Sequence, residues 1–272
     1  MADDDLTFTG ERLHAEDALF GIDLLRHRAA YQAALDHAYA VATPRILELG
    51  SGTGYGTAEL AEALAARFGT ADRGVVGVDR VAPLDVGRRS PAQFLRADLN
   101  ALPLRGDDFE LVLSFQVIEH LPDPTRYVDA LANHLREDGT SLVTTPNAAF
   151  SDGENPFHVR EYEAQDLHDL LAARFHDVEM LGVSARGEAL AYHEARLARI
   201  RRIVRIDPFG LRKRIPTKQA EWLFARLALV VRRGIGADER LTRATLADFR
   251  VEPAHERSVD LMAVCRRPRR DT

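Results

Sequence analysis

Short runs of apolar residues alternate along the chain with stretches in which apolar residues recur every three or four positions, which separates strands from amphipathic helices. The continuous runs lie at residues 45–49, 74–79, 92–96, 109–115, 140–145, 177–183 and 258–265. The helical periodicity is found at residues 18–41, 55–68, 124–135 and 161–175. Because the predicted strands are largely apolar and alternate with helices, they indicate an α/β fold, a parallel sheet with helices on both faces.

A longer helical segment interrupts the alternation before the last predicted strand. A chain of 272 residues is long enough for one α/β domain with an elaboration. We expect an N-terminal acidic segment and helix over residues 1–41, and a Rossmann-like domain over residues 42–186 and 248–268. Residues 187–247 are expected to form a basic helical insertion.

Positive charge is concentrated in the first half of this insertion. The chain has a net charge of −6, yet residues 186–214 contain nine Lys or Arg and three Asp or Glu. No aromatic residues are interleaved with the arginines of residues 196–205, and the rest of the chain is acidic. The pattern argues against nucleic-acid binding and indicates one local basic surface.

Cysteine content and hydropathy favour a cytoplasmic protein. Cys265 is the only cysteine, which excludes an internal disulfide framework and a zinc cluster of cysteines. The first residues are acidic and lack the apolar core of a signal peptide. No stretch approaches the roughly 20 apolar residues that cross a membrane.

Three glycines mark the turn between the first strand of the predicted sheet and the helix that follows. Gly50, Gly52 and Gly54 allow positive φ and let a ligand approach the backbone. Their spacing, G-x-G-x-G, differs from the G-x-G-x-x-G of dinucleotide-binding proteins. Asp79 ends the second strand, where a carboxylate can accept hydrogen bonds from ribose hydroxyls. Asp98 follows the third strand and is placed to accept a hydrogen bond from an adenine amino group.

Four ordered motifs together resemble those of class I S-adenosylmethionine-dependent methyltransferases. They are ELGSGTG at residues 48–54, Asp79, ADL at residues 97–99 and FQVIEHL at residues 115–121. The resemblance covers about residues 44–184. It implies an enzyme that uses S-adenosylmethionine, built on a Rossmann-like seven-stranded sheet whose last strand is antiparallel.

The resemblance also implies a cofactor site that combines all four motifs. Its residues are Glu48, Gly50, Ser51, Gly52, Gly54, Asp79, Asp98, Leu99 and Gln116. The glycine loop is implied to cradle the methionine part, with Glu48 helping to hold the amino group through the loop. Asp79 is implied to bind the ribose, Asp98 the adenine end, and Gln116 to line the pocket near the methionine.

Polar residues after the fourth and fifth strands are candidates for catalysis, because ligands of such sheets lie beyond the carboxyl ends of the strands. Methyl transfer to a hydroxyl needs a base, and the pKa of histidine lies near working pH. His120 is the first candidate for this base and His158 the second, with Glu119 as an orienting residue or metal ligand. A structural role remains open for both histidines, at a helix start for His120 and in a hydrogen-bonded loop for His158.

Hard metal ligands are grouped in the same region of the sequence. Glu119, His120 and Asp123 lie close together but match no firm ligand spacing. A divalent metal therefore stays open as a cofactor, and we assign no metal-binding residue from the sequence.

The acceptor is indicated by two further segments. NPFH at residues 155–158, followed by Arg160-Glu161-Tyr162, and LTFTGER at residues 6–12 resemble sugar and polysaccharide methyltransferases, in particular sugar O-methyltransferases of actinobacterial polymethylated polysaccharides. This resemblance implies a hydroxyl of a sugar, an oligosaccharide or a lipid-linked glycan as the acceptor. A quinone, a phenol or another natural product is the alternative acceptor.

Two hypotheses outside the methyltransferases are also open. One is a Rossmann-like domain that holds a cofactor without transferring anything, and the other is a nicotinamide-dependent oxidoreductase, which the glycine spacing disfavours. The basic insertion has three interpretations: a lid with a solvated face, a surface for anionic acceptors, or a contact with an anionic membrane surface.

Overall fold

We analysed a computed structural model of the chain. The structure describes residues 21–42, 44–69, 74–84, 89–99, 101–106, 109–153, 155, 157–205 and 243–270. The motif at residues 6–12 and most of the expected insertion, residues 206–242, lie outside the described residues.

The described chain folds into helices and strands that alternate through its first half. In chain order they are α1 (Gly21–Tyr39), β1 (Ile46–Leu49), α2 (Tyr55–Phe68), β2 (Val75–Asp79), β3 (Gln93–Arg96), β4 (Phe109–Phe115), η3 (Ile118–His120), α4 (Thr125–His134), β5 (Leu135–Pro146), η4 (Ala148–Phe150), α5 (Ala164–Ala172), β6 (Phe175–Ala185), α6 (Gly187–Arg205), η6 (Leu246–Asp248), β7 (Phe249–Pro253) and β8 (Asp260–Pro268). The η elements are single turns of 3₁₀ helix.

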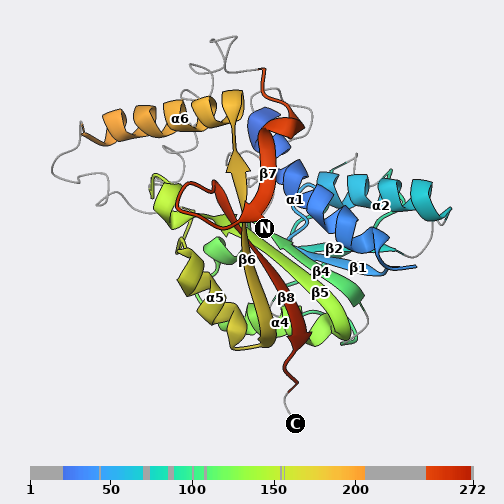
Figure 1. The fold of residues 1–272 in the computed structure, drawn as a ribbon. Coiled ribbons are helices and arrows are strands. Elements are labelled where there is room, and N and C mark those ends of the chain that lie inside the picture. The colour runs from blue at the N-terminus through green and yellow to red at the C-terminus, as the bar shows by residue number, and fades with distance from the viewer. Residues whose placement is uncertain are drawn as a thin grey trace, which may run out of the picture.

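All strands in the described residues belong to one sheet in the order β3-β2-β1-β4-β5-β8-β6-β7. The strands from β3 to β5 are parallel, and β8 lies antiparallel between β5 and β6. The expected Rossmann-like α/β fold with an antiparallel last strand is therefore confirmed. Figure 1 shows the sheet with α1 and α2 on one side and α4 and α5 on the other.

The sheet has one strand more than the seven that we expected. The additional strand, β7, pairs antiparallel with β6 at the edge of the sheet. Its five residues include Arg250, Glu252 and Pro253, and only Phe249 is buried. An edge strand has one open side and needs no continuous apolar run, so the rule that found the central strands could not find it.

The strand β5 also begins earlier than expected. We predicted a helix up to residue 135 and a strand from residue 140, but α4 ends at His134 and β5 begins at Leu135. The pairing with β4 is irregular here, because Phe109 lies opposite Leu135 while Leu111 lies opposite Thr140. The polar residues of this irregular stretch lack the apolar signature of a central strand.

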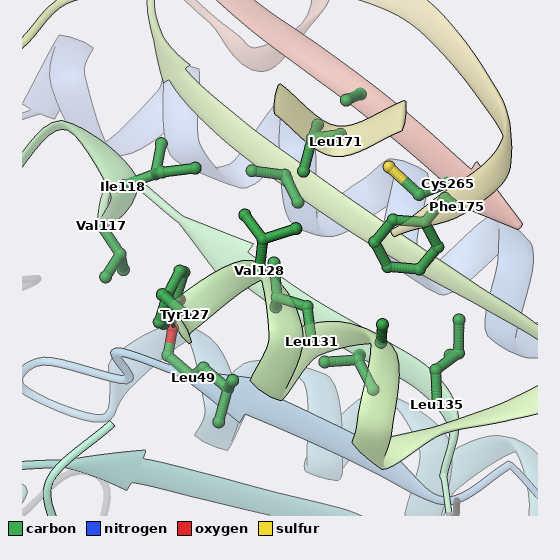
Figure 2. Packing of buried hydrophobic residues seen from close by; sticks show 14 of the residues in the cluster. Leu49, Val117, Ile118, Tyr127, Val128, Leu131, Leu135, Leu171, Phe175 and Cys265 are labelled. Carbon is green, nitrogen blue, oxygen red and sulfur yellow. Dashed lines mark hydrogen bonds between the residues drawn. The ribbon is translucent and has the colours of Figure 1, made fainter. Parts of the chain in front are cut away.

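Alternating residues of the central strands build two cores. In β8, Leu261, Ala263 and Cys265 face α4 and α5, whereas Met262 and Val264 face α1 and α2. Figure 2 shows the first core, in which side chains of α4 and α5 pack against the sheet. Burial on both faces explains why these strands are largely apolar. No described helix is long and apolar enough to cross a membrane.

Candidate functional site

The glycine loop lies between β1 and α2, at the carboxyl edge of the sheet. Gly50, Gly52 and Gly54 have φ of 86°, 55° and 85°, the left-handed region that glycine adopts without strain. A Cβ on Gly50 would lie 2.3 Å from Val117 Cγ2, so this glycine is required for packing. A Cβ on Gly52 would meet nothing within 4 Å. The loop is thus packed at Gly50 and open at Gly52, where a ligand can approach the backbone.

Asp79 lies next to this loop because β2 pairs with β1 and both strands end at the same edge. One carboxylate oxygen accepts a hydrogen bond from the Gly52 amide at 2.9 Å, and the other accepts one from the Val81 amide at 3.0 Å. The buried residue Ser51 donates its amide to the Val78 carbonyl at 3.1 Å. The loop and the end of β2 therefore form one hydrogen-bonded unit.

Glu48 is buried beside the loop and contacts both flanking helices. Its carboxylate accepts hydrogen bonds from the Tyr31 hydroxyl of α1 and from the Thr57 hydroxyl of α2, the latter at 2.5 Å. Burial raises the pKa of Glu48 to about 7, although both hydrogen bonds act in the opposite direction. These contacts hold α1 and α2 against β1, which is compatible with an indirect role through the loop.

Gln116 follows β4 in a conformation that is rare for its residue type. Its φ is 57°, and its amide donates to the Thr144 carbonyl at 3.0 Å. Its neighbour Val117 is the residue that packs on Gly50. A non-glycine residue held at positive φ costs about 1–3 kcal/mol and is common at functional sites. The turn after β4 is therefore packed directly against the glycine loop.

Asp98 and Leu99 lie further along the same edge. They follow β3, which pairs with β2 so that Asp79 lies opposite Arg96. Asp98 is exposed, and Leu99 is partly buried against the core on the α4 side. The structure thus places all of the expected cofactor residues along one edge of the sheet.

A second cluster forms where the chain leaves β4 and β5. Glu119 is fully buried, and one of its carboxylate oxygens accepts a hydrogen bond from the Thr145 hydroxyl at 3.0 Å. The other oxygen, Oε1, lies 4.0 Å from His120 Nε2 and has no hydrogen-bond partner among the described residues. Burial raises the pKa of Glu119 to about 7. The cluster therefore contains a carboxyl group whose second oxygen faces an imidazole.

His120 has a defined tautomer. Its Nδ1 lies 2.9 Å from the Phe157 carbonyl oxygen, which can only accept a hydrogen bond. In the neutral ring the proton is therefore on Nδ1, and Nε2 carries the lone pair. The His120 side chain is about one-third exposed. A basic nitrogen thus lies at the surface of a site whose neighbouring carboxyl group is buried.

His158 approaches His120 from a later loop, with 5.2 Å between the ring centroids. The amides of Val159 and Arg160 donate to the Glu119 carbonyl at 2.8 and 3.2 Å, which fixes this loop against η3. His158 Nδ1 lies 2.7 Å from Glu161 Oε1, and its Nε2 lies 2.7 Å from the Asn155 amide nitrogen. The three expected catalytic residues are thus brought together.

Asp123, which the sequence grouped with Glu119 and His120, has a different role. Its carboxylate is exposed and accepts a hydrogen bond from the Thr125 amide at 3.0 Å, at the first turn of α4. The histidine that completes the cluster is His158, which returns through tertiary contacts. The cluster in the structure thus differs from the grouping along the sequence, from which no metal ligand was assigned, because proximity along the chain does not reflect the path of the loop.

Sequence reasoning also missed Arg26 and Asp260. Asp260 begins β8 at the carboxyl edge of the sheet, is fully buried, and accepts a hydrogen bond from Arg26 Nη1 at 2.9 Å. It is the single charged residue in the apolar run at residues 258–265. A charge inside a run that was predicted to be buried was the signal that could have identified it.

Comparison with known proteins places this arrangement in one family. A family model described as a methyltransferase domain matches residues 22–199. The chain therefore belongs to the S-adenosylmethionine-dependent methyltransferases, and its cofactor is S-adenosylmethionine.

Relatives that share much of the chain carry the same description. A probable S-adenosylmethionine-dependent methyltransferase of Mycolicibacterium smegmatis is 33% identical over 97% of this chain and 96% of its own length. Relatives of that description in Mycobacterium tuberculosis are 38% identical over 65% of this chain, a match that spans 64% of their length, less than two thirds.

A solved structure supports the fold. A methyltransferase of Thermotoga maritima, titled a possible histamine N-methyltransferase, superposes with a TM-score of 0.52 over 89% of this chain and 91% of its own, at 14% identity. At this identity the likeness establishes the fold, and the acceptor has to be argued from the residues of this chain.

Proposed function

We propose that this protein transfers the methyl group of S-adenosylmethionine to a hydroxyl group of a sugar, an oligosaccharide or a lipid-linked glycan. The observation that carries the proposal is the position of His120. Its basic Nε2 lies at the edge of the sheet that holds the glycine loop, beside the buried carboxyl group of Glu119. This combination suits an acceptor that must lose a proton during the reaction.

The residues of the glycine loop and the strand ends supply the proposed cofactor site. The accessible backbone at Gly52 contacts the methionine part of S-adenosylmethionine, and Gly50, Ser51 and Gly54 set the conformation of the loop. Asp79 is held by two backbone amides, which leaves its carboxylate oriented for ribose hydroxyls. Asp98 and Leu99 extend the site toward the adenine, Gln116 lines its methionine end, and Glu48 acts through the loop.

Methyl transfer is an in-line displacement, so the protein has to align the acceptor and remove its proton. The acceptor oxygen forms a bond to the methyl carbon, and the carbon–sulfur bond breaks with its electron pair going to sulfur. The hydroxyl proton goes to His120 Nε2, which leaves S-adenosylhomocysteine and a methyl ether. The carboxylate of Glu119 then stabilises the imidazolium, since opposite charges attract and the carboxylate itself is buried.

His158 has a positioning role in this scheme. Both of its ring nitrogens are engaged, by Glu161 and by Asn155. Asn155 Oδ1 also accepts a hydrogen bond from the Phe157 amide at 3.1 Å, and the Phe157 carbonyl is the partner of His120. The loop thus fixes the tautomer of the proposed base.

Support for a glycan acceptor comes from the residues of this same loop and from α6. The loop contains the Asn155–His158 segment that resembles sugar methyltransferases, and it is built into the cluster rather than lying apart from it. The exposed arginines of α6, Arg199, Arg201 and Arg202, are compatible with an acceptor that carries phosphate.

The test is an acceptor screen with the full chain. The protein is incubated with S-adenosylmethionine and three groups of acceptors: neutral and phosphorylated oligosaccharides, reduced quinones, and phenols. Mass spectrometry of the products then identifies any methylated compound. Methylation of oligosaccharides alone is expected, and methylation of quinols or phenols alone would replace the glycan proposal by the other acceptor class. Binding of the cofactor without any product in a broad screen would favour the non-catalytic reading.

A further inference from the structure

A small cleft lies at the carboxyl edge of the sheet, between α1 and α6. One wall is apolar and includes Ile22 of α1 and Phe249 of β7. The polar part of the lining comes from the two helices and includes Asp23, Arg26, His193 and Arg196. Ligand sites in proteins are commonly clefts of this composition, in which an apolar wall is combined with a few polar groups.

The polar groups of the cleft are connected to the candidate active site. Arg26 forms its ion pair with Asp260, and the Asp260 carboxylate accepts a hydrogen bond from Gln116, at the proposed methionine end of the cofactor. On the other side of the cleft, Arg196 acts electrostatically on the carboxyl group of Glu161, in the loop that fixes the proposed base. The cleft therefore lies beside the place where the acceptor and the methyl group have to meet.

The ion pairs around the cleft are longer than direct hydrogen bonds. Asp23 Oδ1 lies 3.9 Å from Arg26 Nη2 and 3.7 Å from Arg196 Nη1. Arg196 Nη2 lies 3.7 Å from Asp152 Oδ2. Charge-assisted hydrogen bonds are about 2.7–2.9 Å long, so each contact leaves room for a bridging oxygen. A hydroxyl group suits this position, because it can accept from the guanidinium group and donate to the carboxylate.

Two further groups of the lining add one donor and one acceptor. Arg26 Nε is buried and has no hydrogen-bond partner among the described residues, so it needs an acceptor. His193 Nε2 lies 3.1 Å from the Phe150 carbonyl oxygen, and burial lowers the pKa of His193 to about 4. The neutral ring therefore carries its proton on Nε2 and its lone pair on Nδ1.

The charges of this network argue against an ionic ligand. The two guanidinium groups, of Arg26 and Arg196, face the carboxyl groups of Asp23, Asp152 and Asp260. An anion such as phosphate would enter a network without an excess of positive charge, and a cation would meet both guanidinium groups. Because an uncompensated charge is costly where water is excluded, the cleft favours a neutral ligand with several hydroxyl groups.

We propose that the cleft between α1 and α6 binds a neutral sugar ring of the acceptor. Its hydroxyl groups bridge the ion pairs of Asp23 with Arg26 and Arg196, and its C–H groups lie against the apolar wall that includes Phe249. This inference rests on the proposed function, since the acceptor has to be a glycan. It adds that the ring in the cleft carries no phosphate.

The test is ligand-observed NMR on the full chain saturated with S-adenosylhomocysteine. The probes are neutral oligosaccharides of glucose and of mannose, with inorganic phosphate as competitor. Saturable binding of a neutral oligosaccharide is expected, without displacement by phosphate. Arg196→Met removes hydrogen-bond donors from a partly exposed side chain and should raise the Kd by at least ~10-fold. His193→Phe removes an acceptor without leaving a charge unpaired, and it should also weaken binding.

Arg186→Met is the matched control. It removes an exposed arginine that pairs with Glu252 just before α6, and it should bind oligosaccharides as the wild type does. The affinity of each variant for S-adenosylhomocysteine reports whether it is folded. The proposal is overturned if no neutral oligosaccharide binds saturably, or if Arg196→Met and His193→Phe both bind as the wild type does. Displacement by phosphate in the wild type but not in Arg196→Met would show a site for anions and overturn the neutral ligand.

Turnover with the same oligosaccharides separates this inference from the proposed function. Binding that depends on Arg196 and His193 without any methylated product would leave the cleft standing and overturn the proposed function. Methylation with the same KM in the wild type and both cleft variants would leave the proposed function standing and overturn the cleft.

Discussion

Arg26 on α1 and Asp260 at the start of β8 form a buried ion pair, with 2.9 Å between Nη1 and Oδ1. The two residues are 234 positions apart in the sequence. The Asp260 carboxylate also receives a hydrogen bond from the Gln116 side chain, while burial raises its pKa. The pair thus joins the first helix, the last strand and the turn after β4 at the carboxyl edge of the sheet.

Breaking this pair from one side is expected to destabilise the protein strongly. Arg26→Met leaves the Asp260 carboxylate buried without its cation, which typically costs about 3–5 kcal/mol of unfolding free energy. Urea denaturation measures the difference. The matched control is Arg267→Met, which removes a cation from the exposed pair with Asp177 and should change stability far less. Equal losses in the two variants would contradict a special role for the buried pair.

Two substitutions in the glycine loop are expected to separate an effect on stability from an effect on cofactor binding. Gly50→Ala should unfold at clearly lower urea concentration than Gly52→Ala, because its methyl group would overlap Val117. Gly52→Ala carries only the strain of a left-handed residue, about 1–2 kcal/mol, but its methyl group would occupy the space offered to the ligand. We expect this variant to fold and to bind S-adenosylhomocysteine more weakly in calorimetric titration.

Gly69→Ala is the control for backbone strain. Gly69 has φ of 68° and nothing within 4 Å of its added Cβ, but it lies at the far end of α2. It should lose stability as Gly52→Ala does and keep the wild-type affinity for S-adenosylhomocysteine. Unchanged affinity in Gly52→Ala would remove the loop from the cofactor site.

Asp79→Ala is expected to weaken cofactor binding by about 1.5–3 kcal/mol, the usual value of hydrogen bonds to a charged group. The variant also loses the hydrogen bond from the Gly52 amide, so the loop itself becomes less ordered. Calorimetric titration with S-adenosylmethionine and S-adenosylhomocysteine measures the loss. Asp169→Ala, an exposed change on α5, should leave the affinity as it is. Binding of NAD with similar affinity would point to the oxidoreductase alternative instead.

The buried carboxyl group of Glu48 predicts a pH dependence of stability. Because its pKa is raised from 4.5 to about 7 in the folded protein, the native state binds this proton more tightly than the unfolded chain. The contribution of Glu48 to the free energy of unfolding is therefore greatest below about pH 4.5. It falls by about 3 kcal/mol as the pH rises through 7. Glu48→Gln should make the decline of unfolding free energy between pH 4.5 and 7 shallower.

The unfolding free energy of Glu48→Gln should still decline with pH, since burial also raises the pKa of Glu119 to about 7. Glu137→Gln, on an exposed stretch of β5, is the control and should decline as the wild type does. A slope in Glu48→Gln that matches the wild type would show that Glu48 is ionised in the folded protein at low pH.

His120→Ala is expected to lower turnover by at least ~100-fold, because general-base catalysis contributes about that much or more. Its affinity for S-adenosylhomocysteine should stay within a factor of two or so of the wild type, since the residue is assigned to the acceptor. Turnover is measured in chelated protein, so that a metal does not complicate the result. His168→Ala, an exposed change on α5, is the control. Retained turnover in His120→Ala would sink the assignment.

The sequence predicted the strands of the sheet except β7, which lies at one edge. Strands such as β1 and β4 are buried on both faces, so they are largely apolar and easy to recognise. The strand β7 has an open side, and its mixture of charged and apolar residues carries no comparable signal. Local patterns therefore identified the strands that contain a run of apolar residues.

The same limit applied to the candidate site. The glycine loop, Asp79 and Gln116 could be placed because each follows a recognisable strand. The contact of the His158 loop with Glu119 and His120 could not be predicted, because it depends on the amides of Val159 and Arg160 meeting the Glu119 carbonyl. The partner of Asp260 was equally hidden, since α1 reaches it only in the folded protein.

The position of β8 has a consequence for how the protein is synthesised. This strand follows every other described strand in the chain, yet it lies inside the sheet and pairs with β5 and β6 along their length. Until β8 leaves the ribosome, β5 and β6 each expose an unpaired strand edge, and Arg26 lacks its contact with Asp260. A nascent chain that stops before residue 260 should therefore be prone to aggregation and should depend on chaperones until the last strand inserts.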